Sequence, residues 1–275
     1  MSEVKSAYSG VTVRIISAVV LIPPVVAIIW FGGLLYTALL AVGGSLMMLE
    51  WLKLTKVEDK TMPVIGVVLL VGTLWAMLDR DSWSFAVVYS QLFFGCGVMA
   101  IALKWVNMRD MAWLVLGLMY ILALVLSMYW LRENGDSFSA MMTVFWVFLV
   151  VWGTDIGGYF AGKSIGGPKL APKISPKKTW AGLLGGMVLA ALASVALNFV
   201  FFDGNNWLLL IAISASLAVV AQIGDLLESA IKRRFDVKDS GSVIPGHGGL
   251  LDRVDGLVTV AALVAFMMSL PEGLL

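Results

Sequence analysis

Five acidic residues in the carboxyl-terminal half of the chain have the types and spacing of a cation site. They are Asp155, Asp225, Glu228, Asp252 and Asp255. Asp252 and Asp255 are three residues apart, and Asp225 and Ser229 are four apart, so each pair would share one face of a helix. Gathered carboxylates repel one another unless a cation joins them. With one Cys and one His, a thiolate zinc site is excluded, a His-rich metal site is not expected, and Mg²⁺ is favoured over Zn²⁺. The acids could instead pair with nearby Lys and Arg.

The loop Lys232–Arg253 combines glycines, basic residues and the single histidine of the chain. Gly246, Gly248 and Gly249 would let the backbone come close to a ligand. Backbone amides, the start of the next helix and several cations would together bind a polyphosphate. Two simpler explanations stay open: the loop contacts anionic lipid, and His247 has a structural role.

A second loop, Gly162–Thr179, brings two more cations to the edge of an apolar segment. Pro172 and Pro176 prevent a regular helix there. Lys177 and Lys178 lie at the level of the lipid headgroups, where they could hold a phosphate from a lipid or a nucleotide. They could equally be a topology signal, because cytoplasmic loops of membrane proteins are rich in Lys and Arg.

The elements that must position these residues are membrane-spanning helices. Of the 275 residues, 60% are apolar and 13% are charged, and the mean hydropathy is +0.94. Soluble domains carry about 25% charged residues, and each membrane span needs roughly 20 apolar residues. We therefore expect an all-α transmembrane bundle of about nine spans, at Ile15–Phe31, Leu34–Leu49, Val64–Leu78, Phe85–Leu103, Met111–Leu131, Phe138–Gly162, Trp180–Phe202, Trp207–Ser229 and Val254–Leu270.

The basic residues orient this bundle. With the N-terminus inside, all but two of the 19 Lys and Arg residues fall on the inside, and only Arg80 and Arg132 fall outside. The five acids and both long loops then lie at the same face of the membrane. We expect residues 1–140 to form N-terminal transmembrane helices, and residues 141–275 to form catalytic transmembrane helices with cytoplasmic loops.

A Mg²⁺, a polyphosphate and a lipid phosphate together suggest phosphoryl or nucleotidyl transfer at the membrane surface. A secondary transporter is the main alternative outside the enzymes, but it would favour ionisable residues near the middle of the bilayer. Another membrane transferase acting on a lipid phosphate is the alternative among enzymes. The net charge of +1 gives no indication of a nucleic-acid partner.

The segment Ser229–Asp255 resembles the signature of the phosphatidate cytidylyltransferases, also called CDP-diacylglycerol synthases. It reads Ser-Ala-Ile-Lys-Arg, then four residues, then Lys-Asp-Ser-Gly-Ser-Val-Ile-Pro-Gly-His-Gly-Gly-Leu-Leu-Asp-Arg-Val-Asp. Upstream, Asp155–Lys163 and Ser175–Thr179 are similar to a further motif region of this family. The specific resemblance covers about Trp152–Gly256, whereas the first 140 residues match only as apolar spans.

The resemblance implies a nucleotidyltransferase that converts CTP and phosphatidic acid into CDP-diacylglycerol and pyrophosphate, in phospholipid biosynthesis. It also implies Mg²⁺, a second cation such as K⁺, and a homodimer. For this reaction the expected metal ligands are Asp155, Asp225, Asp252 and Asp255. The expected catalytic residues are Asp225, Lys232, Arg233, Lys238, Asp239, His247, Asp252 and Arg253, and the expected substrate-binding residues are Lys177, Lys178, Ser229, Gly248 and Gly249.

The expected location is a bacterial inner membrane, with the active site facing the cytoplasm. The chain has no Arg- and Ser-rich presequence of the kind that directs proteins to organelles. A cytoplasmic site would meet CTP directly, and phosphatidic acid would enter from the membrane lipid.

Overall fold

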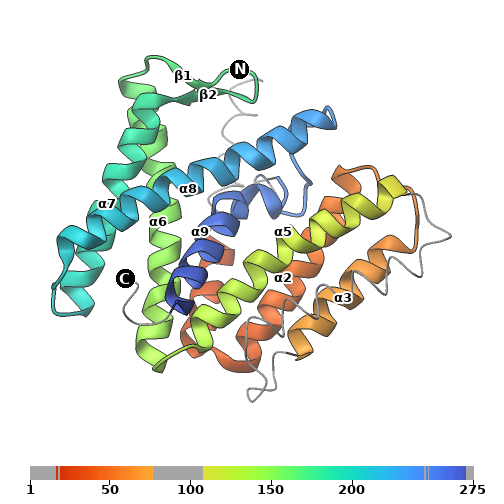
Figure 1. The fold of residues 1–275 in the computed structure, drawn as a ribbon, viewed down its shortest axis with the longest axis horizontal. Helices are drawn as coiled ribbons and strands as arrows, with labels where there is room; N and C mark the ends of the chain where they lie inside the picture. Colours follow the sequence, from red (N-terminus) through yellow and green to blue (C-terminus); the bar gives the residue numbers. More distant parts are fainter. Residues whose placement is uncertain (1–16, 18, 77–107, 245, 247, 271–275) are drawn as a thin grey trace. The chain divides into compact units, whose positions relative to one another are not determined.

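The computed structural model describes residues 17, 19–76, 108–244, 246 and 248–270, which form helices and a short β-hairpin (Figure 1). The chain divides into two compact units. The first combines Met1–Tyr129 with Asp239–Asp252, and the second combines Trp130–Lys238 with Arg253–Leu275. Most of the glycine-rich loop therefore belongs with the amino-terminal helices. The expected functional division at residue 140 stays a prediction.

The described helices of the first unit are Val19–Phe31, α2 (Gly33–Leu54), α3 (Met62–Ala76) and most of α5 (Met108–Glu133). Aromatic residues fix α2 against α5. Trp51 is buried, its Nε1 donates a hydrogen bond to Trp113 O at 2.7 Å, and its ring stacks on Tyr120 with centroids 5.5 Å apart. Nearer the start of α2, Tyr36 Oη donates to Met128 O at 3.0 Å. These contacts fix the position of α2 against α5, and with it the position of the residues at the carboxyl end of α2.

The described elements of the second unit are α6 (Ser137–Ser164), β1 (Lys169–Ala171), β2 (Ser175–Thr179), α7 (Trp180–Phe201), α8 (Trp207–Arg234) and most of α9 (Leu251–Ser269). Side-chain caps mark two of the helix starts. Asp136 accepts hydrogen bonds from the amides of Phe138 and Ser139, and Thr179 Oγ1 accepts one from the Gly182 amide at 3.0 Å. Asp and Thr suit these positions because they satisfy amides that lack a partner within the helix.

The loop between α6 and α7 forms an antiparallel hairpin rather than irregular chain. β1 and β2 pair Lys169 with Thr179, and Ala171 with Ser175. Its prolines predict that this loop is not helical, and that prediction is confirmed. The two strands are a small addition to the expected all-α class, and they give Lys177 and Lys178 a defined position on β2.

Glycines bring α6 and α7 into close contact. A Cβ on Gly186 of α7 would lie 2.7 Å from Thr154 O of α6, and a Cβ on Gly157 would overlap the carbonyl group of Gly185. Small residues at the contacts of membrane helices let two backbones approach in this way. The contact holds Asp155, which lies on α6 between Thr154 and Gly157, at a set distance from the start of α7.

Eight of the nine predicted spans overlap helices of the described residues. The fourth span, 85–103, lies outside the described residues, as do residues 15, 16 and 18 of the first span and 77 and 78 of the third. In the described ranges, five helices are long and apolar enough to cross a membrane: α2, α5, α6, α7 and α8. Helix Val19–Phe31 and α3 are apolar but shorter. The helical class is confirmed, whereas nine spans and an inside N-terminus stay predictions.

Candidate functional site

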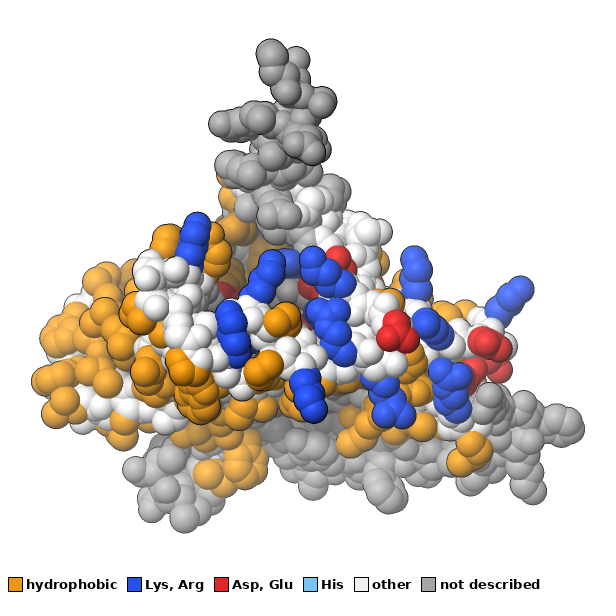
Figure 2. Space-filling view, turned by 90° about the horizontal axis from the view of Figure 1, so that it is seen from above, with side chains coloured by type: hydrophobic (Ala, Val, Ile, Leu, Met, Phe, Trp, Pro, Cys, Tyr) orange, Lys and Arg blue, Asp and Glu red, His pale blue; other side chains and the backbone are white. Residues whose placement is uncertain are grey.

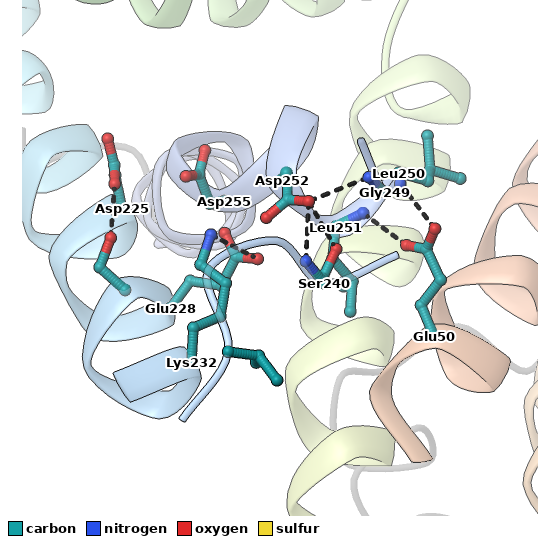
Figure 3. A network of polar contacts seen from close by, with 12 residues as sticks. Glu50, Asp225, Glu228, Lys232, Ser240, Gly249, Leu250, Leu251, Asp252 and Asp255 are labelled. Carbon is teal, nitrogen blue, oxygen red and sulfur yellow. Dashed lines mark hydrogen bonds and ion pairs between the residues drawn. The ribbon is translucent and has the colours of Figure 1, made fainter. Parts of the chain in front are cut away.

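An ion pair in the second unit joins the hairpin to α8. The ammonium group of Lys178, on β2, contacts Asp225 Oδ2, and the two side chains are 17% and 26% exposed. Asp225 Oδ1 also accepts a hydrogen bond from Ser229 Oγ at 3.3 Å (Figure 3). The prediction that Asp225 and Ser229 share one helix face is confirmed. Lys178 supplies positive charge at this carboxylate.

The carboxyl end of α8 holds the turn of the hairpin. Arg233 Nε donates a hydrogen bond to Ile174 O at 3.4 Å, and its Nη1 donates to Val237 O at 3.2 Å. Four of the predicted anion-binding cations have exposed side chains: Lys177, Arg233, Lys238 and Arg253. Figure 2 shows Lys and Arg side chains standing out from the surface, among apolar ones. These four cations are therefore accessible to a charged ligand.

A glycine lets α8 and α9 approach one another beside the carboxylates. A Cβ on Gly224 would lie 2.5 Å from Thr259 Oγ1 and 2.7 Å from Asp255 O. Thr259 Oγ1 donates a hydrogen bond across this contact to Val220 O at 3.0 Å. The close approach brings Asp225, the residue after Gly224, near enough to Asp255 for their charges to interact.

Asp155 on α6 completes this group of acids. Its carboxylate interacts electrostatically with Asp225 and with the positive charges of Lys178 and Arg253. Asp255 interacts with both of the other acids. The second unit thus gathers three of the four predicted metal ligands, on α6, α8 and α9.

The donor chemistry of this acidic group suits a hard cation, since Mg²⁺ prefers carboxylate oxygens. In the part of the chain that the structure describes, however, no three Asp, Glu, His or Cys side chains converge as a ready-made metal site. Basic side chains contact two of the acids: Lys178 contacts Asp225, and Lys232 Nζ lies 3.4 Å from the fully buried Glu228. The alternative that the acids pair with basic residues is therefore confirmed at these two positions.

The fourth predicted ligand, Asp252, lies in the first unit and organises the loop before it. We call residues 239–252 the signature loop. Asp252 Oδ2 accepts hydrogen bonds from the amide of Ser240, the hydroxyl of Ser240 and the amide of Gly249, each at 2.9 Å (Figure 3). Gly248, at φ +86°, would place a Cβ 3.1 Å from the same oxygen. The signature loop therefore folds around this carboxylate.

A second carboxylate, Glu50 at the end of α2, holds the signature loop from outside. Glu50 Oε1 accepts a hydrogen bond from the Leu250 amide at 2.9 Å, and Oε2 accepts one from the Leu251 amide at 3.0 Å (Figure 3). Glu50 is not among the residues that the sequence predicts for the site. The available signal was an acidic residue at the end of an apolar segment, because ionisable residues in spans are costly and mark functional positions.

The hydrogen bonds of these two carboxylates change the expected anion site. From the sequence, backbone amides at the start of α9 are expected to bind phosphate. In the structure, the amides of Gly249, Leu250 and Leu251 donate to carboxylates of the protein itself. The side-chain cations are then the remaining predicted anion-binding groups. Asp239 and Gly248 lie in the same loop, and His247 lies outside the described residues, so the roles predicted for them stay predictions.

Comparison with known proteins identifies the family. A sequence model described as the cytidylyltransferase family matches residues 12–270. A phosphatidate cytidylyltransferase of Brucella suis biovar 1 is 38% identical over 258 residues, which cover 93% of this chain and 92% of that protein. The Bacillus subtilis protein of the same name is 33% identical, with 87% of this chain and 90% of that protein covered. One from Staphylococcus aureus (strain COL) is 31% identical, with coverage of 93% and 98%.

These matches span both units. They therefore include the amino-terminal helices, which contain none of the family motifs found in the sequence. The resemblance carried by residues 229–255 is confirmed. The chain therefore belongs to the cytidylyltransferase family, alongside these phosphatidate cytidylyltransferases.

Proposed function

We propose that this chain transfers the cytidylyl group of CTP to phosphatidic acid, giving CDP-diacylglycerol and pyrophosphate. The observation that carries the proposal is the match to relatives named phosphatidate cytidylyltransferase over nearly the whole chain. The acidic group and the exposed cations of the second unit suit a substrate that carries several phosphates. The transporter alternative is not favoured.

In the proposed reaction, a phosphate oxygen of phosphatidic acid attacks the α-phosphorus of CTP. The bond from that phosphorus to the oxygen leading to the β-phosphate breaks, and pyrophosphate leaves with the bonding electrons. A phosphomonoester has a second pKa of about 6, so the nucleophile is already largely ionised at neutral pH. No general base is required, and catalysis consists of positioning and charge neutralisation.

The exposed cations would neutralise the triphosphate and the lipid phosphate: Lys177, Arg233, Lys238 and Arg253. Lys178 contacts Asp225, so it would have to exchange this carboxylate for a substrate phosphate when the substrate binds. Lys232 stays paired with the buried Glu228, so its proposed effect on the substrate is electrostatic. Ser229 would orient the carboxylate of Asp225, to which it donates a hydrogen bond.

The expected cation fits this arrangement by donor chemistry. Asp155, Asp225 and Asp255 are the proposed Mg²⁺ ligands from the second unit, with Asp252 as the further predicted one. When bound, Mg²⁺ would neutralise charge on the triphosphate and make pyrophosphate a better leaving group. A second cation such as K⁺, a homodimer, and a bacterial inner-membrane location with the site facing the cytoplasm belong to the same proposal.

Pyrophosphate release by the purified, detergent-solubilised protein tests this function. We expect release only when CTP, phosphatidic acid and Mg²⁺ are all present, with CDP-diacylglycerol formed in equal amount by mass spectrometry. EDTA should stop the reaction, and excess Mg²⁺ should restore it. Release from CTP without lipid, or lipid-dependent release with ATP in place of CTP, would contradict the proposal, as would the absence of release from folded protein.

A further inference from the structure

We infer that Glu50 is a positioning residue for the signature loop, and this inference rests on the proposed function. Glu50 lies at the carboxyl end of α2 and is 5% exposed. It is 200 residues from Leu250 in the sequence, yet both belong to the first compact unit. A residue of the amino-terminal helices thus sets the position of the loop between Lys238 and Arg253.

The contact has the form of a helix cap supplied from a distant part of the chain. The first amides of a helix have no partner within the helix, and the helix dipole favours a negative charge beside them. The amides of Leu250 and Leu251, at the start of α9, donate to the two oxygens of Glu50 at 2.9 and 3.0 Å. Hydrogen bonds to an ionised acceptor are about twice as strong as neutral ones.

The signature loop is shaped to receive this carboxylate. A Cβ on Gly241 would lie 2.6 Å from Glu50 Oε1, and a Cβ on Gly249 would lie 2.9 Å from the same atom. The Gly249 Cβ would also overlap Ser240 Oγ, which is bonded to Asp252. The absence of side chains at these two glycines therefore serves the packing of the loop around two carboxylates, one on each side.

Glu50 is itself held firmly, which a positioning residue requires. Its neighbour Trp51 is buried, donates to Trp113 O at 2.7 Å and stacks on Tyr120. The end of α2 is thereby fixed to α5. The Glu50 carboxylate is therefore held in one position, and the amides of the loop bond to it there. Loss of this contact should shift Lys238 and Arg253, which flank the loop and are proposed to contact the triphosphate. A misplacement of about 1 Å can cost about 100-fold in activity, so the use of CTP should suffer.

The first test replaces Glu50 with Gln. Glu50→Gln removes the negative charge and replaces one accepting oxygen with an NH₂ group, which cannot accept a hydrogen bond from a backbone amide. We therefore expect kcat/KM for CTP to fall about 10- to 100-fold. The loss should appear mainly in the KM for CTP, with the KM for phosphatidic acid unchanged, because the loop flanks are the proposed triphosphate contacts. Hydrogen exchange should quicken at residues 249–252 and stay unchanged in α7. Glu58→Gln, at an exposed position after α2, is the matched control and should match wild type.

Two further variants keep the inference testable if Glu50→Gln does not fold. Glu50→Asp retains the charge and should recover part of the affinity for CTP. Gly241→Ala leaves Glu50 in place but puts a methyl group against its carboxylate, so it should reproduce the rise in KM and the faster exchange. Gly72→Ala is its control, because a Cβ there would meet no atom within 4 Å.

Wild-type kcat/KM in Gly241→Ala, or an activity loss in Glu50→Gln without faster exchange at residues 249–252, would overturn the inference. So would equal losses in the kinetics of both substrates. A wild-type protein that shows no CTP-dependent release would overturn the proposed function instead. The exchange measurement needs no activity, and it would still report whether Glu50 holds the loop.

Discussion

A methyl group at Gly157 should damage the active site through the packing of α6 on α7. In Gly157→Ala the new Cβ would lie 2.9 Å from both the carbonyl carbon of Gly185 and the Cβ of Leu189, besides overlapping the Gly185 oxygen. Carbon atoms pack at about 3.5–4.0 Å, so the two helices must separate locally by roughly 0.6 Å or more. Overpacking of this kind costs about 1–3 kcal/mol, partly offset by about 0.5–1 kcal/mol for the better helix propensity of Ala over Gly.

The separation matters for function because the two helices carry different parts of the site. Asp155 lies on α6, two residues before Gly157, whereas Lys178 lies on β2, which leads directly into α7. Their charges interact in the native packing. Pushing α6 from α7 therefore moves Asp155 away from Lys178, and displacements approaching 1 Å can reduce rates by about 100-fold. We expect Gly157→Ala to lower kcat about 10- to 100-fold with a modest loss of thermal stability.

The next residue supplies the control. A Cβ on Gly158 would meet only Gly182 O, at 3.5 Å, which is an ordinary contact. Gly158→Ala should keep wild-type kcat, and its thermal midpoint should be unchanged or slightly raised because Ala favours helix. Pyrophosphate release and thermal unfolding in the same detergent compare the two variants. If they behave alike in both measurements, the packing argument is wrong.

Two further predictions concern single carboxylates. Asp225→Asn removes the acid that contacts Lys178 and Ser229, so it should lower turnover by about 100-fold or more while the protein stays folded. Glu58→Gln is the control, and near-wild-type pyrophosphate release from Asp225→Asn would exclude Asp225 from the proposed metal site. Asp136 caps α6, and hydrogen bonds from the amide and hydroxyl of Ser139, with a smaller one from Phe138, hold the pKa of its carboxyl below the ordinary value. A lowered folded-state pKa means that the contribution of Asp136 to stability is complete above the unfolded pKa of about 3.9 and is lost as the pH falls through the folded pKa. Thermal midpoints between about pH 5 and pH 3 should therefore fall more steeply for wild type than for Asp136→Asn, whose side chain also caps but does not titrate; parallel curves would contradict this.

Periodicity and hydropathy predicted the described helices because lipid demands long apolar segments with all backbone groups paired. Helix α6 begins at Ser137 and the expected span at Phe138, and α7 and α8 begin at the expected residues, Trp180 and Trp207. Caps explain part of this agreement, since Asp136 and Thr179 are residues that start helices. The hairpin was harder to predict, because Pro172 and Pro176 exclude helix without specifying which strands pair.

The acidic group was predictable in part. Acids at the ends of apolar segments mark costly positions, and the charges of Asp155, Asp225 and Asp255 do interact with one another. Their ion pairs with lysines were left open as an alternative, because sequence proximity of Lys and Asp does not show whether their side chains meet. The contact of Lys178 with Asp225 depends on the docking of the hairpin on α8, which Arg233 and Ile174 secure.

Glu50 shows why the sequence could not identify the partners of the amides in the signature loop. Glycines next to a helix start indicate close approach of some group, and a phosphate or a carboxylate of the same chain satisfies the same amides equally well. Only the fold of α2 against the loop decides between them. Because Glu50 and Asp252 already occupy the amides of residues 249–251, a triphosphate near this loop would meet two carboxylates rather than free donors. In the proposed function, the loop would contribute to binding by holding Lys238 and Arg253 at its two ends, and its glycines would act through the shape of the loop.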